Sequence, residues 1–150
     1  PLYSSAASDV YKRQGIDYSK LSVTWANLQW DGGNISVGEK FNAGSKVFIS
    51  GLTNLAESAT SGNKHVTCEI GYSATDPNPS GAGWTWTTCP WNGDWGNEYY
   101  YQGFTPAVSE AGTYYYTFRY RIDNGAYVYA GTDGLWNGAN SVCGTFQVTR

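Results

Sequence analysis

Short runs of alternating apolar and polar residues recur along the chain, separated by clusters of Gly, Asn, Asp, Ser and Pro. Side chains that alternate with a period of two lie on opposite faces of a β-strand, and no stretch keeps the 3.6-residue period of a helix. The pattern predicts an all-β, antiparallel β-sandwich of about eight strands. The strands are expected over residues 21–25 continuing across 28–30, 46–50, 64–73, 84–89, 98–105, 113–122, 126–130 and 142–149.

The clearest strand covers residues 113–122. Its even-numbered positions from Tyr114 to Ile122 are all aromatic or aliphatic, whereas the odd positions carry Tyr115, Thr117, Arg119 and Arg121. Because alternate residues face opposite sides of a sheet, the even-numbered side chains are predicted to lie in the core.

Two local signals flank this strand. Asn124-Gly125 predicts a two-residue type I′ turn, which would pair Tyr120 with Tyr129 and bury Tyr127 and Tyr129. Gly112 followed by Tyr114 resembles the tyrosine corner of immunoglobulin-like sandwiches, in which the phenol bonds to upstream backbone. The second signal makes an immunoglobulin-like sandwich the expected fold.

Residues 4–14 resemble the in-frame translation of a common transposase-type sequencing adapter. We therefore expect residues 1–14 to be a disordered assembly artefact and residues 15–150 to form a single domain. On this interpretation the true N-terminus is missing, and the lack of a signal peptide carries no information about location.

Composition narrows the function classes. The net charge is −3, which argues against nucleic acid as a partner, and no apolar run is long enough for membrane insertion. Seven Trp and 13 Tyr residues are more aromatic surface than a core of this size needs. Aromatic faces in polar loops suit ligands that present C–H surfaces and hydroxyls together, as sugars do. The composition therefore favours a polysaccharide partner.

Three tryptophans, Trp91, Trp95 and Trp136, occur in Gly-, Asn- and Asp-rich stretches that are read as loops. Each ring either binds a sugar or folds back as a lid on the sandwich. Trp25 and Trp30 look structural. Trp84 and Trp86 project to one face, either as a flat platform or as core.

Polar residues near these rings would set specificity. The predicted carbohydrate-binding set is completed by Asp94, Tyr100 and Asn137, with turn chemistry as the alternative role of Asp94 and Asn137. Tyr100 faces away from Tyr99 and Tyr101 because neighbours along a strand alternate.

Enzymatic activity is not expected. The single histidine, His65, is interpreted as a surface strand residue, and no nucleophile elbow is present. No cofactor is predicted, although residues 131–138 could hold a structural Ca²⁺ in a weak match. Cys68, Cys89 and Cys143 allow one disulfide or none, and the spacing leaves open which pair would form it.

A wider resemblance rests on Trp25-Ala26-Asn27-Leu28-Gln29-Trp30, residues 70–73, 97–99, 112–116 and 127–129. Together these are similar to accessory β-sandwich modules of secreted bacterial amylase-type, pullulanase-type and surface proteins. The resemblance implies a non-catalytic, extracellular or cell-surface module, monomeric and tethered to catalytic or surface domains. It implies no binding residues.

The leading hypothesis is a carbohydrate-binding module for a polysaccharide, with a starch-like glucan favoured. Its rival is an immunoglobulin-like spacer or protein-interaction module without a glycan site. Exposure of the aromatic side chains discriminates between the two, because a contiguous exposed aromatic patch usually marks an interaction site.

Overall fold

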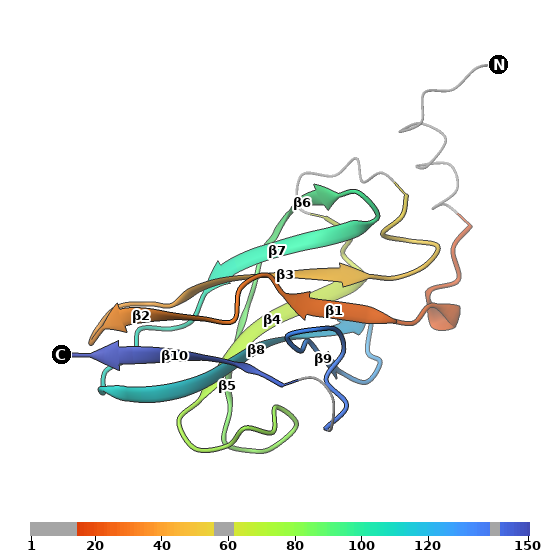
Figure 1. Ribbon diagram of the computed structural model, residues 1–150. Helices are drawn as coiled ribbons and strands as arrows, with labels where there is room; N and C mark the ends of the chain where they lie inside the picture. The colour runs from red at the N-terminus through yellow and green to blue at the C-terminus, as the bar shows by residue number, and fades with distance from the viewer. Residues whose placement is uncertain (1–14, 56–61, 139–141) are drawn as a thin grey trace.

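The computed structural model describes residues 15–55, 62–138 and 142–150, so the expectation for residues 1–14 lies outside the described residues. Two β-sheets pack face to face (Figure 1). One has four strands in the order β1-β3-β7-β6. Its strands are β1 (Trp25–Leu28), β3 (Asn42–Phe48), β7 (Glu98–Phe104) and β6 (Trp91–Trp95).

The other sheet has six strands in the order β2-β10-β8-β4-β5, with β9 added along β8. These are β2 (Gly32–Ser36), β10 (Gly144–Thr149), β8 (Gly112–Ile122), β4 (Val66–Ser73), β5 (Thr85–Thr88) and β9 (Val128–Tyr129). The β2–β10 pair is parallel, and the other strand pairs are antiparallel. The described residues thus confirm the predicted all-β sandwich, with ten strands instead of eight.

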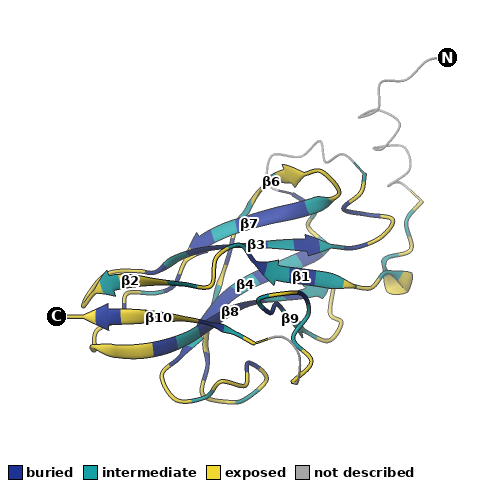
Figure 2. Cartoon of the chain, in the orientation of Figure 1, coloured by how far each residue is buried: buried dark blue, intermediate teal, exposed yellow. Residues whose placement is uncertain are grey.

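Alternation along β8 builds the core. Tyr114, Tyr116, Phe118 and Tyr120 are buried between the sheets, as predicted. Figure 2 shows the resulting dark-blue interior along β8, β4 and β7. Tyr120 also donates a hydrogen bond from its hydroxyl to Ser45 Oγ at 2.6 Å, which ties the six-stranded sheet to β3 of the other. Burying a tyrosine with its hydroxyl bonded avoids the cost of an unsatisfied polar group.

The predicted tyrosine corner is confirmed. The Tyr114 hydroxyl donates to the backbone carbonyl of Glu110 at 2.8 Å, four residues upstream. Gly112 has φ 151°, in the range that favours glycine, and it starts β8. The corner anchors the beginning of the longest strand of the core.

The turn after β8 differs from the prediction. Gly125 N–H donates to the Ile122 carbonyl at 2.9 Å, and the positive φ falls on Asp123 instead of on Asn124-Gly125. Tyr120 therefore pairs with Val128, and Arg119 with Tyr129. A shift of one residue exchanges the faces of a strand, so the predicted burial of Tyr127 and Tyr129 with Tyr120 is wrong. Both rings instead lie on the outer face beside Arg119.

Two strands were not predicted. β2 begins with the Gly32-Gly33 pair, which was interpreted as a turn, and β6 was interpreted as a loop because of its Asn, Gly and Asp residues. Each is held by its neighbour, β10 for β2 and β7 for β6. Strand propensity depends strongly on such tertiary context. The only helical element in the described part of the chain is a single 3₁₀ turn, η1 (Tyr18–Lys20), so no described helix could cross a membrane.

Candidate functional site

Among the described strands, the outer face of the four-stranded sheet carries the most exposed aromatic side chains, Trp95 and Phe104. The β6–β7 hairpin creates this arrangement: Trp95 pairs with Glu98 across a turn in which Gly96 has φ 68°. Tyr100 lies two residues further along β7 on the same face as Glu98. The hairpin therefore fixes Trp95 and Tyr100 on one surface.

Trp95 lies flat against Tyr100, with ring centroids 5.0 Å apart and an interplanar angle of 24°. The Lys46 ammonium is 4.3 Å from the centre of the Trp95 ring system. Trp95 nevertheless remains 53% exposed. The Tyr100 ring supports the indole from the protein side, and the indole keeps more than half of its surface for a ligand.

A chain of amides lies beside this stack. The Tyr100 hydroxyl donates to Gln102 Oε1 at 3.0 Å, and Asn92 Nδ2 donates to the same oxygen at 3.2 Å. Gln102 Nε2 in turn donates to Asn42 Oδ1 at 2.8 Å. Burial raises the pKa of the Tyr100 phenol, which therefore remains a donor at neutral pH. The amides are thereby oriented before any ligand arrives.

Two further aromatics extend the surface, and neither was in the predicted set. Phe104, at the end of β7, is 55% exposed, and Trp30 is 36% exposed. A Cβ placed on Gly44 would lie 3.1 Å from Trp30 Cζ3 and would also meet the Tyr100 hydroxyl. Because Gly44 has no side chain, the Trp30 and Tyr100 rings can both pack directly on the backbone of β3. The two-residue spacing of Tyr100, Gln102 and Phe104 in the sequence was a signal that could have identified Phe104.

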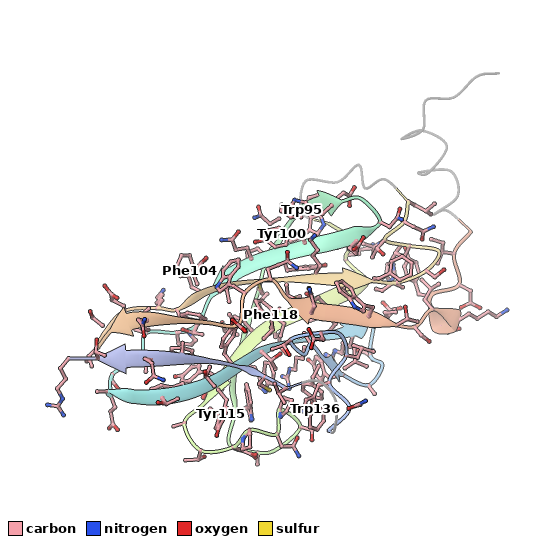
Figure 3. The ribbon with its side chains drawn as sticks, viewed as in Figure 1. Trp95, Tyr100, Phe104, Tyr115, Phe118 and Trp136 are labelled. Atoms are coloured by element: carbon pink, nitrogen blue, oxygen red, sulfur yellow. The ribbon has the colours of Figure 1, made fainter. Side chains whose placement is uncertain are left out.

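We call this surface the platform, and it has eight members. They are Trp30, Asn42, Lys46, Asn92, Trp95, Tyr100, Gln102 and Phe104. Figure 3 shows Trp95, Tyr100 and Phe104 following one another along β6 and β7 on the outside of the sandwich. Aromatic planes that alternate with amide groups offer apolar contact and hydrogen bonds to one ligand.

The structure separates the six predicted binding residues. Trp95 and Tyr100 are together on the platform. Trp91 meets Tyr99 edge-on at a centroid distance of 6.2 Å and packs against the core, and it also lines a hollow beside Phe104. Asp94 pairs with Tyr99 and therefore lies on the opposite side of β6 from Trp95.

The other two predicted residues, Trp136 and Asn137, lie in the connection between β9 and β10. The Trp136 ring meets Tyr129 edge-on at 6.1 Å, and Asn137 is exposed. Tyr129 belongs to the outer face of the six-stranded sheet, so Trp136 and the platform are on opposite sides of the molecule (Figure 3). One ligand molecule of modest size cannot contact both.

The outer face of the six-stranded sheet, which we call the covered face, holds Trp84 and Trp86. Their rings stack at 5.3 Å, and Trp84 is only 9% exposed. The Arg119 guanidinium lies 4.4 Å from the Trp86 ring and 3.9 Å from the Tyr127 ring. Its nitrogens bond to Glu69 Oε1 at 2.7 Å. Trp84 and Trp86 therefore share a face, as predicted, but it is neither the inter-sheet core nor a bare platform.

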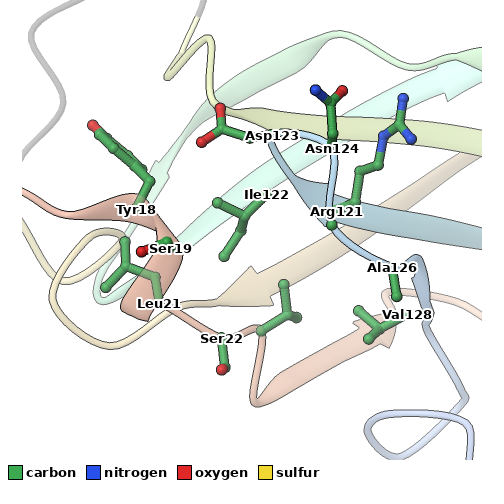
Figure 4. Close-up of a pocket in the computed structure, with 12 residues that line it drawn as sticks. Tyr18, Ser19, Leu21, Ser22, Arg121, Ile122, Asp123, Asn124, Ala126 and Val128 are labelled. Atoms are coloured by element: carbon green, nitrogen blue, oxygen red, sulfur yellow. The ribbon is translucent and has the colours of Figure 1, made fainter.

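A groove of about 470 Å³ lies at one end of the sandwich, between η1 and the turn after β8 (Figure 4). His65 is at this end: it stacks on Tyr18 at 3.8 Å, and its Nδ1 lies 2.6 Å from Asp123 Oδ1. The histidine immediately precedes β4 and is partly exposed, close to the surface position that was predicted. These contacts fasten the segment before β1 to the sandwich.

Within the described ranges, no group of three or more His, Cys, Asp or Glu side chains is arranged to hold a metal ion. Residues 131–138, the weak calcium match, contain one carboxylate, that of Asp133. No family model matches the sequence, and no curated protein matches it. The two outer faces of the sandwich therefore provide the geometry from which a function can be inferred.

Proposed function

We propose that this protein is a non-catalytic carbohydrate-binding module that holds a polysaccharide on the platform. The observation that carries the proposal is Trp95, which rests on Tyr100 yet is 53% exposed, next to oriented amides on the same surface. An exposed indole supplies a flat apolar face for the C–H side of a sugar ring. The amides of Asn42 and Gln102 supply both donors and acceptors for hydroxyls.

Preorganisation supports the same function. Binding is weakened by the cost of ordering mobile side chains, at about 0.5–1.5 kcal/mol for each. On the platform Tyr100 and Lys46 already restrain Trp95, and Tyr100 and Asn42 already restrain Gln102. A sugar chain would therefore meet a surface that loses little freedom on binding.

The resemblance to accessory modules of amylase-type and pullulanase-type proteins makes a starch-like glucan the first polysaccharide to test. The same resemblance favours a module that lies outside the cell or at its surface and is attached to catalytic or surface domains. These parts of the proposal rest on the resemblance, whereas the binding surface rests on the platform.

Affinity gel electrophoresis of the full chain through starch, xylan, β-glucan and mannan tests the proposal. We expect at least one polysaccharide to retard the wild-type protein, and Trp95→Ala to restore free mobility. Trp136→Ala is the matched control, since it removes the same ring type from the opposite side of the molecule.

Equal retardation of Trp95→Ala and the wild type would show that the binding site is not on the platform. Loss of retardation in Trp136→Ala alone would move it to the covered face. Unchanged mobility of the wild type in all gels would favour the rival function, a spacer or protein-interaction module.

A further inference from the structure

We infer, resting on the proposed function, that the platform binds the interior of a linear, uncharged glycan chain through two separate subsites. Trp95 forms one subsite, and Phe104 with its neighbouring amides forms the other. Trp95 pairs with Glu98 at the start of β7, and Phe104 ends the same strand. These ends are about 20 Å apart at about 3.3 Å per residue, but the Trp95 ring lies against Tyr100, four residues before Phe104, so the two subsites are about 13 Å apart along the strand. That length exceeds a single sugar and fits a chain that runs along β7.

The Phe104 subsite is a hollow of about 400 Å³. Asn42, Asn92 and Gln102 line it together with the exposed Phe104 ring. Each amide –NH₂ has two hydrogens, and the hydrogen bonds that Asn92 and Gln102 donate use one hydrogen of each group. The remaining hydrogens and the amide oxygens meet hydroxyl groups, while Phe104 contacts the ring carbons.

The charges on the platform select an uncharged chain. Lys46 and Glu98 are the charged side chains that β3 and β7 direct to this face, and both lie at the Trp95 end. Their charges are opposite, so they do not favour a polyanion. The Phe104 hollow is lined by uncharged side chains. A carboxylated sugar would lose hydration there without gaining a cation.

Isothermal titration of the full chain with maltose through maltohexaose, and with cello-oligosaccharides of the same lengths, tests the two-subsite inference. In the responsive series, we expect affinity to rise by about tenfold from the disaccharide to the longer members and then to level off. Phe104→Ala should abolish the increase and keep the weak disaccharide binding at Trp95. Val37→Ala, which truncates an exposed apolar residue outside the platform, should leave the whole series unchanged.

The outcomes separate the two hypotheses. Equal affinity for short and long chains, or an intact length dependence in Phe104→Ala, overturns the two-subsite inference and leaves glycan binding at Trp95 in place. Tighter binding of polygalacturonate that weakens with added salt overturns the preference for an uncharged chain. The absence of binding to every oligosaccharide and polysaccharide contradicts the proposed function itself.

A second inference rests on a different observation: we propose that Cys68 and Cys89 form a disulfide when the protein folds under oxidising conditions. Glu69 pairs with Thr88, so the next step of the ladder sets Cys89 opposite Cys68. The Cys89 N–H donates to the Cys68 carbonyl at 2.9 Å. Residues opposite each other in antiparallel strands have Cα atoms about 4.5–5.5 Å apart, within the range of disulfides.

Cys143 is excluded as a partner by its position. It precedes Gly144, which pairs with Tyr116, whereas Cys68 pairs with Tyr120 on the other side of β8. Continued by one residue, the ladder sets Cys143 opposite Thr117, three residues and about 10 Å along β8 from Tyr120, which is beyond disulfide reach even before the spacing between the strands is added. The structure thus chooses among the pairings that the sequence left open.

Oxidised glutathione supplies the oxidant. One cysteine thiolate attacks its S–S bond, forms a mixed disulfide and releases one glutathione thiolate. The second cysteine then attacks the protein sulfur of the mixed disulfide and releases the second glutathione. Both thiols are buried, and burial together with the neighbouring Cys89 raises the pKa of Cys68. The exchange therefore requires folding from the unfolded state, in which thiolates are accessible.

Refolding the reduced full chain in a glutathione redox buffer, followed by maleimide labelling under denaturing conditions, tests this proposal. We expect one labelled thiol, that of Cys143, and a Tm about 10 °C above that of protein refolded with dithiothreitol. Cys143→Ser should keep the Tm difference and leave no thiol to label. Three labelled thiols in refolded wild type, or a peptide map that links Cys143 to another cysteine, would overturn the proposal.

Discussion

The platform and the covered face are both rich in aromatic residues, but they differ in what lies on top of the rings. On the platform, Trp95 and Phe104 are more than half exposed. On the covered face, Trp86 stacks on Trp84 and also contacts the Arg119 guanidinium, and Trp84 is almost entirely buried. Both faces therefore combine tryptophan rings with a nearby cation, but the aromatic side chains of the platform are more exposed to solvent.

The comparison shows that aromatic content alone does not locate a binding site. Arg119 satisfies its charge with Glu69 and places its guanidinium against two rings, so the covered face already makes the contacts that a ligand would offer. Trp95 is also near a cation, Lys46, but no ring or strand covers its remaining surface in the described residues. The rings of the covered face are occupied by contacts within the fold, whereas Trp95 on the platform keeps more than half of its surface exposed.

Truncating one tryptophan on each face should produce the largest contrast. Trp86→Ala removes contacts to Trp84, Tyr129 and Arg119, and should lower the free energy of unfolding by about 3 kcal/mol. Trp95→Ala should cost less than about 1 kcal/mol because its ring is largely exposed. Urea unfolding measures both. Similar losses for the two variants would refute the distinction.

Adding one methyl group beneath each face should sharpen the comparison. In Gly71→Ala the new Cβ would overlap the Trp86 ring, which Trp84 and Arg119 hold in place, so we expect a loss of about 2 kcal/mol. In Gly44→Ala the Trp30 and Tyr100 rings can move outward, so we expect about 1 kcal/mol and weaker glycan retardation. A Gly44→Ala variant that loses more stability than Gly71→Ala would show that the platform is the tighter face.

Alkaline pH should separate the platform from the core by a smaller effect. Burial raises the pKa of Tyr100 above the ordinary value of 10.0, and it raises the pKa of Tyr120 in the core much further. A raised phenol pKa stabilises the fold fully below the ordinary value, and this contribution is lost as the pH increases above it. Glycan affinity should therefore fall, through ionised Tyr100, at a lower pH than that at which the fold is lost.

The measurement is a pH series of affinity electrophoresis beside circular dichroism. Tyr100→Phe is the control, because it has no ionisable phenol and its weaker binding should not change over the same pH interval. Loss of binding and of structure at the same pH would contradict the separate titration of platform and core.

The sequence predicted the regions whose structure depends on local periodicity. The alternation along β8 and the bond from Tyr114 to Glu110 both follow from neighbouring residues. The register of Tyr127 and Tyr129 could not be predicted from neighbouring residues. The positive φ of the turn lies at Asp123 and not at Asn124-Gly125, which shifts the pairing by one residue. Asp123 makes two contacts with His65 at this turn: its carboxylate lies beside His65 Nδ1, and its backbone N–H donates to the His65 carbonyl. A distant residue thus decided the turn.

For the candidate site, the sequence identified Trp95 and Tyr100 as residues of interest, but it did not place them on one face. Trp30, which was interpreted as structural, contributes to the platform. Trp136 and Asn137 lie on the other side of the molecule because the β9–β10 connection packs against Tyr129. Such groupings join residues from strands that are far apart in the sequence.

The sequence by itself determined eight of the ten strands, the all-β sandwich class and the excess of aromatic residues, because alternation and composition are local properties. Only the tertiary structure decided which aromatic side chains remain exposed to solvent. Exposure depends on what other segments place above a ring: Trp84 and Arg119 cover Trp86, whereas Tyr100 supports Trp95 from below. The same residue type is covered by its neighbours in one case and left more than half exposed in the other.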